Sequence, residues 1–423
     1  MTTTSLSLRV CLDARLVGGT SGGIESVVIG MTGALSRLMD GQVTYLILAY
    51  PDAHEWLKPF VSGACSLLFT RKPAPPQYSN AQSRTVRLAR TVADMVVPLL
   101  GPSAIRVPRS DGTIEKAGVH VMHFLFQSGF LTEIPSIYHP HDLQHIHLPQ
   151  FFSPRIRLKR EMLYRGLCQQ ARMVAVASGW SKCDLIQHYG LGEDKVRVIA
   201  WPPVVEQYPQ PTIDQLQMVK RKFDLPERFV FYPAQTWPHK NHLALLEALA
   251  ILRQKYSLCV SLVSSGRLYK PFFYTLQQRA HTLQIADQVR FLDFVSPLEL
   301  MSLYALCRCV VVPTKLEATS QPVAEAFWVG APVACSNVTS LPEQAGDAAL
   351  IFDPNRPGEI AEAIRRLWID DALCQSLVAR GKRNIERFSW ERTARIFRAH
   401  YRRIAGRPLA EEDRALLLSL PEY

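Results

Sequence analysis

The segment RFVFYPAQTWPHKNHLALLEALAILRQKY, residues 228–256, joins two sequence patterns across a short loop. Residues 228–234 form a nearly continuous apolar run, typical of a strand buried on both faces of a parallel sheet. Residues 242–256 have the length and composition of a helix. A strand followed directly by a helix is the repeating unit of a doubly wound α/β sheet.

The same alternation extends in both directions. Helices are expected at 297–307 and 322–330. Further strands are expected at 8–14, 43–49, 119–125, 134–138, 173–177, 196–200, 258–266, 289–295, 308–314 and 331–337. We therefore predict two Rossmann-like domains, with ligands bound between them at the carboxyl ends of the strands.

The proline-rich segment WPPVVEQYPQP, residues 201–211, separates the two series and is expected to be a linker. It places an N-terminal domain at 1–202 and a second domain at 203–387. Residues 72–117 are rich in proline and arginine around one amphipathic stretch at 83–99. We expect this part to be an insertion with one helix.

Composition excludes several classes of protein. The chain has 423 residues, and 48 basic against 37 acidic side chains give a net charge of +11. No apolar run approaches the roughly 20 residues that span a bilayer, and the N-terminus lacks the pattern of a signal peptide. The nine cysteines include no C-x-x-C pair. We expect a cytoplasmic protein with reduced thiols.

The basic residues concentrate at 71–109, 155–172 and 380–407. Each cluster is either a solvated helix face or a surface that attracts an anionic partner. Apolar residues at helical spacing accompany the arginines of 155–172, which favours peripheral contact with an anionic membrane. No aromatic RNA-binding stripe or zinc knuckle is present, so we expect no nucleic-acid partner.

The sharpest candidate site is EATSQPVAE, from Glu317 to Glu325. A strand ends shortly before it, Ser320 is a plausible helix N-cap, and Pro322 suits the first helical turn. The free N–H groups of such a turn form a site for an anion. Glu325 could accept hydrogen bonds from a ribose diol, and Glu317 could reach a sugar hydroxyl. Alternatively, Glu325 is only an acid favoured near a helix N-terminus.

This segment resembles the E-x7-E signature of the retaining GT-B glycosyltransferases of family four, the group 1 glycosyltransferases. Residues 231–249, 289–307 and 330–354 are similar to the family's phosphate-binding loop, its base-binding strand, and the stretch after the signature. The resemblance implies two facing Rossmann-like domains, with helices over 388–423 that pack back on the N-terminal domain. The N-terminal domain would hold the acceptor, and the C-terminal domain the nucleotide-diphosphate sugar.

The resemblance also implies roles for individual residues. His141, Glu317 and Lys240 take the catalytic positions. The donor-binding positions are Gly22, Gly23, Gln235, Lys240, Gly266, Phe294, Val295, Ser320, Gln321, Val323 and Glu325. Glycines at 22 and 23 also permit positive φ and close approach of a ligand, although an ordinary turn would use them too.

Some positions depart from the family pattern. Gln235 replaces an arginine and brings no charge, for which Arg267 could compensate. Asp293 stands where glycine is frequent, and Thr319-Ser320 where Phe-Gly is frequent. Asp142 could orient the imidazole of His141, although adjacent side chains can also point apart. We expect His139, His145 and His147 to be structural. With no further ligands matched to these histidines and no D-x-D motif, we expect no metal site and no cofactor besides the nucleotide sugar.

The expected reaction is retaining transfer of a hexose or deoxyhexose, with mannosyl-type sugars favoured and GDP or UDP as the carrier. The acceptor would be a glycan, by context lipid-linked, in the synthesis of a cell-surface polysaccharide at the inner membrane face. Two alternatives are a nucleotide-sugar epimerase of the same fold and a non-catalytic protein that binds nucleotide sugars.

Overall fold

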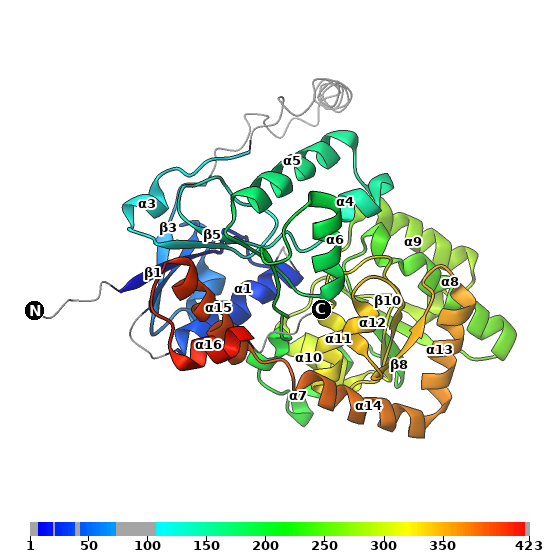
Figure 1. Cartoon of the computed structure of the whole chain (residues 1–423). Helices are drawn as coiled ribbons and strands as arrows, with labels where there is room; N and C mark the ends of the chain where they lie inside the picture. Colours follow the sequence, from blue (N-terminus) through cyan, green and yellow to red (C-terminus); the bar gives the residue numbers. More distant parts are fainter. Residues whose placement is uncertain (1–6, 20–21, 39–42, 73–106, 419–423) are drawn as a thin grey trace, which may run out of the picture. The chain divides into compact units, whose positions relative to one another are not determined.

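The computed structural model describes residues 7–19, 22–38, 43–72 and 107–418. The chain divides into two compact units (Figure 1). The first contains the residues up to 177, 181–199 and those from 391 onward, and the second contains 178–180 and 200–390. Most of the predicted insertion, including the helix expected at 83–99, lies outside the described residues.

The first unit is built on a parallel sheet of seven strands in the order β3-β2-β1-β4-β5-β6-β7. Its strands are β1 (Leu8–Asp13), β2 (Val43–Ala49), β3 (Cys65–Phe69), β4 (Val121–Phe124), β5 (Ser136–Tyr138), β6 (Met173–Val176) and β7 (Val196–Val198). Its helical segments are α1 (Gly23–Ser36), η1 (Glu55–Phe60), α3 (Thr113–Lys116), α4 (Gln144–His147), η3 (Pro149–Phe151), α5 (Pro154–Gln170), α6 (Gly179–Tyr189), α15 (Trp390–Ile404) and α16 (Glu411–Leu418).

The second unit has a parallel sheet of six strands in the order β10-β9-β8-β11-β12-β13. Its strands are β8 (Phe229–Pro233), β9 (Ser261–Ser265), β10 (Val289–Phe291), β11 (Cys309–Val312), β12 (Val333–Ser336) and β13 (Ala349–Phe352). Its helical segments are η4 (Val204–Gln207), α7 (Ile213–Lys222), η5 (Pro238–Lys240), α8 (His242–Tyr256), α9 (Lys270–Thr282), η6 (Ala286–Gln288), α10 (Pro297–Leu306), α11 (Gln321–Val329), α12 (Leu341–Ala345), α13 (Pro357–Ile369) and α14 (Asp371–Ile385).

These two sheets confirm the predicted doubly wound α/β class. The central strands β8 and β11 are buried as their apolar sequences indicated. Two strands were not predicted, β3 and β13. Both lie at sheet edges and pair on one side only, and most of their residues are partly or fully exposed. Such strands lack the long buried run that marks a central strand.

The C-terminal helix α15, red in Figure 1, is part of the core of the first unit. Phe397 and Tyr401 are fully buried. The Tyr401 hydroxyl lies 2.6 Å from Nδ1 of His123 in β4, and Nε2 of His123 lies 2.8 Å from Nε2 of His139. This buried polar chain joins the end of the sequence to two central strands of the sheet.

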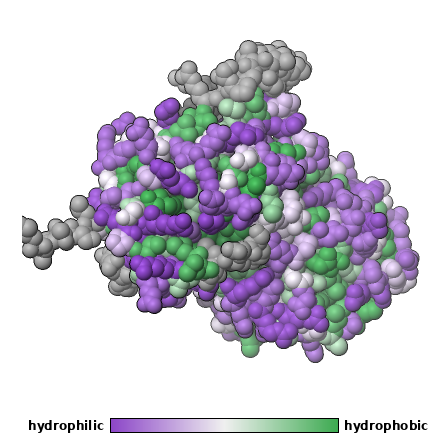
Figure 2. Space-filling view, in the orientation of Figure 1, coloured by the Kyte–Doolittle hydropathy of each residue, from purple (hydrophilic) through white to green (hydrophobic). Residues whose placement is uncertain are grey.

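Figure 2 shows hydrophobic residues interspersed with hydrophilic ones over the visible face. Large exposed apolar side chains include Ile156 in α5 and Ile213 in α7. Across the described part of the chain, every helix is too short or too polar to span a bilayer.

Candidate functional site

Most of the predicted donor-binding residues lie at one edge of the second unit's sheet. Because all six strands are parallel, the loops that follow them leave the sheet at the same edge. Gln235 and Lys240 follow β8, Gly266 follows β9, and Phe294 and Val295 follow β10. The loop after β11 carries Glu317 and ends at Ser320, the N-cap of α11, and α11 contains Gln321, Val323 and Glu325.

Lys240 and Glu317 meet at this edge. The Lys240 ammonium donates to Oε1 of Glu317 at 2.5 Å, and the two side chains are 23% and 12% exposed. The backbone fixes Lys240, because its N–H donates to the Trp237 carbonyl and its carbonyl accepts from the buried Tyr232 hydroxyl at 2.9 Å. A cation and a carboxylate are therefore held side by side and open to a ligand.

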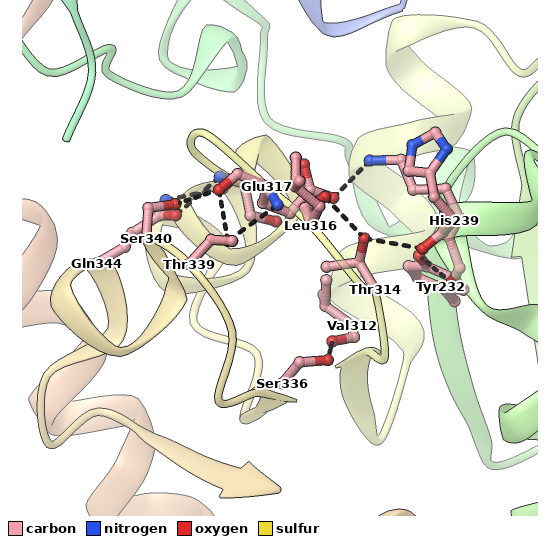
Figure 3. Close-up of polar contacts among 12 residues, drawn as sticks. Tyr232, His239, Val312, Thr314, Leu316, Glu317, Ser336, Thr339, Ser340 and Gln344 are labelled. Atoms are coloured by element: carbon pink, nitrogen blue, oxygen red, sulfur yellow. Dashed lines mark hydrogen bonds and ion pairs between the residues drawn. The ribbon is translucent and has the colours of Figure 1, made fainter. Parts of the chain in front are cut away.

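The loop that carries Glu317 is held by hydroxyl groups (Figure 3). Thr339 and Ser340, in the loop after β12, donate to the Glu317 carbonyl at 2.7 and 2.8 Å. The Glu317 N–H in turn donates to the Thr339 hydroxyl. Thr314 donates to the carbonyls of Leu316 and His239, which joins this loop to the one after β8. The position of the Glu317 backbone is thus determined by three neighbouring loops.

The N-terminus of α11 differs from the prediction in one respect. Ser320 is the N-cap residue, but its side chain makes no cap hydrogen bond. Its N–H donates to Oε1 of Gln344 and its carbonyl accepts from Nε2 of the same side chain, each at 2.8 Å. The Ser320 hydroxyl is buried and has no hydrogen-bond partner among the described residues. An unused donor at a helix N-terminus is suited to an anion.

Glu325 is more enclosed than the sequence suggested. It is 5% exposed, and its Oε2 accepts from the Tyr304 hydroxyl in α10 at 2.6 Å. Burial raises the pKa of the Glu325 carboxyl to about 7, and the hydrogen bond from Tyr304 opposes this shift. The Glu325 carboxyl therefore holds its proton to higher pH than an ordinary glutamate does, a property that the sequence did not reveal.

Gln235, in the position of the expected arginine, is held by an aromatic side chain. Its Oε1 accepts from Nε1 of Trp237 at 2.8 Å. The Trp237 ring stacks on Tyr269 with centroids 4.3 Å apart. Because the amide oxygen is engaged, the amide nitrogen is the group that Gln235 can offer to a ligand. Arg267, which could compensate for the missing charge, is exposed in the loop after β9.

Backbone geometry explains why Gly266 and Asp293 occupy their positions in these loops. Gly266 has φ +122°, and a Cβ atom there would lie 2.8 Å from the carbonyl carbon of Ala234. Asp293 has φ 56°, a conformation that aspartate tolerates better than most residues. Its carboxylate accepts from the N–H groups of Leu268 and Phe294, and its carbonyl accepts from Gly266. Asp293 therefore joins the loops after β9 and β10.

The other predicted donor-binding residues differ in exposure. Phe294 is 58% exposed, whereas Val295 is partly buried and packs against the core. The Val323 side chain is completely buried, so only its backbone could contact a ligand. Oε1 of Gln321 is buried and has no hydrogen-bond partner among the described residues.

In the first unit, the glycine pair lies where β1 leads into α1. Gly22 is the N-cap residue with φ 57°, and Gly23 begins the helix. The nearby Gly19 N–H donates to Oε2 of Glu25 at 2.8 Å. Positive φ at Gly22 explains why glycine is needed there.

His141 also has positive φ, 61°, which is uncommon for a residue other than glycine. Its Nε2 donates to the Leu125 carbonyl at 2.9 Å, and burial lowers the pKa of the imidazole. Asp142, which could orient the ring, accepts from the Gln144 N–H through Oδ1. With Nε2 bound to a carbonyl, Nδ1 of the neutral ring is left as an acceptor.

The neighbouring histidines are bonded to side chains. His139 contacts His123, His145 lies 3.1 Å from Glu161, and His147 lies 2.7 Å from Asp184. Several residues that build the site were not predicted. Tyr304 lies in α10, Gln344 lies in α12, and Thr339 and Ser340 lie in the loop after β12. They share no motif or regular spacing that would mark them in the sequence.

Comparison with known proteins gives a family match within the second unit. Residues 214–384 match the family model described as "Glycosyl transferases group 1". The chain is 28% identical over 256 residues to O-antigen chain mannosyltransferase B of Escherichia coli, a match that covers 59% of this chain and 66% of the relative. It is 30% identical over 218 residues to the D-inositol 3-phosphate glycosyltransferase of Rhodococcus opacus (strain B4), which covers 50% and 48%.

Solved structures match almost the whole chain. Sucrose-phosphate synthase from Thermosynechococcus elongatus has a TM-score of 0.70 at 18% identity and covers 94% of this chain and 99% of its own. HepE from Anabaena, solved in complex with UDP and glucose, has a TM-score of 0.67 at 17% identity and covers 93% and 99%. These likenesses confirm the predicted GT-B fold class.

Proposed function

Residues 214–384 belong to the group 1 glycosyltransferases, and from this premise we propose that the chain transfers a hexose or deoxyhexose from a nucleotide-diphosphate sugar to a glycan. Mannosyl-type sugars are favoured, because the E. coli relatives are named as mannosyltransferases. Transfer proceeds with retention and without a bridging metal. GDP and UDP remain the two candidate carriers.

The observation that carries this proposal is the group of anion-binding features around Glu317. Lys240 is open to solvent beside it, and the N-terminus of α11 offers free N–H groups and the unpartnered Ser320 hydroxyl. Negative charge builds up on the diphosphate as the anomeric bond breaks. Donors that already point at this position stabilise the charge without reorganising, which is a large term in catalysis. Gln235 adds a neutral donor through its amide nitrogen.

The roles of the two carboxylates differ in this mechanism. Glu317 is held rigidly through its backbone, so we assign it to a hydroxyl group of the transferred sugar. Glu325 binds the ribose diol as a carboxylate, while Tyr304 occupies one of its oxygens. The leaving phosphate takes the proton of the acceptor in a front-face attack. His141 contributes to positioning the sugar, through Nδ1 of a neutral imidazole.

The acceptor and the location are also proposals. A glycan acceptor is supported by the relatives involved in O-antigen chain synthesis. We propose that this glycan is lipid-linked and that the enzyme works in the cytoplasm at the inner membrane face. The basic helix α5 provides the peripheral contact with anionic lipid.

Activity assays on variants of the Lys240–Glu317 pair test the function. We expect Lys240→Ala and Glu317→Gln each to reduce turnover with GDP-mannose or UDP-hexose by roughly 100- to 1000-fold. The melting temperature should stay close to that of the wild type, since both side chains lie at the surface of the site. Lys382→Ala, at an exposed lysine of α14, is the matched control and should leave turnover unchanged. Near-normal turnover of both site variants would refute the assignment.

A further inference from the structure

Two helices of the first unit, α4 and α6, bring three potential metal ligands together. His147 ends α4, and Asp184 and His188 lie one turn apart in α6. Nε2 of His147 lies 2.7 Å from Oδ1 of Asp184, and Nε2 of His188 lies 3.9 Å from the same oxygen. The ligand atoms of the three residues all lie within 4.8 Å of one another.

Their arrangement differs from that of an ordinary surface ion pair. The Asp184 side chain is only 7% exposed, whereas His147 and His188 are 30% and 22% exposed. The two imidazole rings stack with centroids 5.3 Å apart and 26° between their planes, and both Nε2 atoms lie within 4 Å of the same carboxylate oxygen. A buried carboxylate is thus flanked by two nitrogen ligands that solvent can reach.

We propose that His147, Asp184 and His188 bind a transition-metal ion of the Zn²⁺ class. Zn²⁺ binds imidazole nitrogen and carboxylate oxygen at about 2.0–2.2 Å, commonly through three protein ligands and a water molecule. An ion among atoms this close needs only small side-chain movements to reach those distances. Mg²⁺ and Ca²⁺ prefer sets of oxygen ligands and do not suit two imidazoles.

The sequence predicted no metal site, because no further ligands could be matched to the histidines of residues 139–147. The remaining two ligands lie 37 and 41 positions further along the chain, and only the packing of α4 beside α6 brings them to His147. A D-x-x-x-H pair on a helix is too frequent to mark a site without its third ligand.

Metal binding would stabilise the segment that carries His141. This segment leads directly into α4, and the N–H groups of Ile146, His147 and Leu148 bond to the carbonyls of Leu143 and Gln144. An ion that joins α4 to α6 must be released before this turn can open. The N–H groups of Ile146, His147 and Leu148 should therefore exchange with solvent more slowly when the ion is bound.

The test separates metal binding from a simple Asp–His hydrogen bond. The full chain, free of any histidine tag and stripped of metal, is titrated with Co²⁺ and with Zn²⁺. We expect one Co²⁺ per chain with the visible absorption of a low-coordinate ion, and its displacement by Zn²⁺. His188→Ala removes a ligand but leaves the 2.7 Å contact between His147 and Asp184, so it should weaken binding by more than about 100-fold.

His147→Ala provides a second variant with the same expectation, and His281→Ala, at an exposed histidine of α9, is the matched control that should bind normally. Circular dichroism of each variant verifies folding. Loss of Co²⁺ absorption in both site variants, with slower exchange of the α4 amides in the loaded wild type, supports the site. If a correctly folded site variant binds Co²⁺ as well as the wild type does, the proposed metal site is wrong.

Discussion

Glu325 links the candidate site to the stability of the fold. Burial raises its pKa from an ordinary 4.5 to about 7, against the opposing hydrogen bond from Tyr304. The folded protein therefore holds the Glu325 proton more tightly than the unfolded chain does. The resulting stabilisation is complete below about pH 4.5 and is lost as the pH rises through about 7.

Replacing Glu325 with glutamine should therefore have an effect that depends on pH. We expect Glu325→Gln to change the free energy of unfolding little at pH 5 and to raise it by on the order of 3 kcal/mol at pH 8, where the wild type buries a charge. Urea denaturation at both pH values measures this difference. Glu227→Gln, at an exposed carboxylate, is the control for the loss of one negative charge. An equal effect of Glu325→Gln at both pH values would contradict the prediction.

The same titration should be visible in nucleotide binding if the carboxylate form binds ribose. Affinity for the nucleotide should then rise as the pH increases through about 7. Tyr304→Phe removes the hydrogen bond that lowers the Glu325 pKa, so it should move this rise to higher pH. Isothermal titration calorimetry across pH 5.5–9 can detect the shift. If Tyr304→Phe leaves the pH dependence of nucleotide affinity unchanged, the rise in affinity does not come from the Glu325 carboxyl.

At the scale of elements, the close approach of β8 and β9 depends on a glycine. Gly266 has φ +122°, and an added Cβ atom would lie 2.8 Å from backbone atoms of Ala234 and Gln235. We expect Gly266→Ala to lower the free energy of unfolding by roughly 2 to 5 kcal/mol, from backbone strain and overpacking together. It should also weaken nucleotide binding, because the clash displaces the loop between Ala234 and Lys240.

Gly358 in α13 offers a matched control, since an added Cβ atom there meets no atom within 4 Å. Gly358→Ala should be neutral or stabilise by up to about 1 kcal/mol, because the unfolded chain loses freedom without a clash. Denaturation and nucleotide titration of the two variants side by side measure both effects. If both substitutions prove equally harmless, the loops are not in close contact at Gly266.

Strands and loops could be predicted from the sequence, whereas contacts between side chains could not. Central strands such as β8 and β11 were predicted because burial on both faces requires a long apolar run. The loops of the site were located because parallel strands present their carboxyl ends at one edge. The hydrogen bonds of Glu325 with Tyr304 and of Gln235 with Trp237 were not predicted, because they depend on side-chain packing between elements.

At the scale of the whole molecule, the charge of +11 is concentrated partly on α5. Arg155, Arg157 and Lys159 are exposed on this helix, and Ile156 is 47% exposed among them. In contrast, Arg165 is paired with Glu161, and Arg160 stacks on Phe152. The first turns of α5 are therefore a basic surface with one apolar side chain, which suits an anionic lipid surface better than a neutral one.

Neutralising that surface should remove membrane binding selectively. Each exposed cation contributes on the order of 1 kcal/mol at an anionic surface, so replacing Arg155, Arg157 and Lys159 with glutamine should weaken binding to phosphatidylglycerol vesicles roughly 100-fold. About 1 M salt, where charges are screened beyond about 3 Å, should release the wild type. The matched control replaces Arg221, Lys270 and Arg383, three exposed cations of the second unit, with the same loss of charge. Vesicle sedimentation measures the binding of both triple variants. If both lose vesicle binding equally, the protein is attracted to the membrane by its net charge, and α5 is not a specific membrane contact.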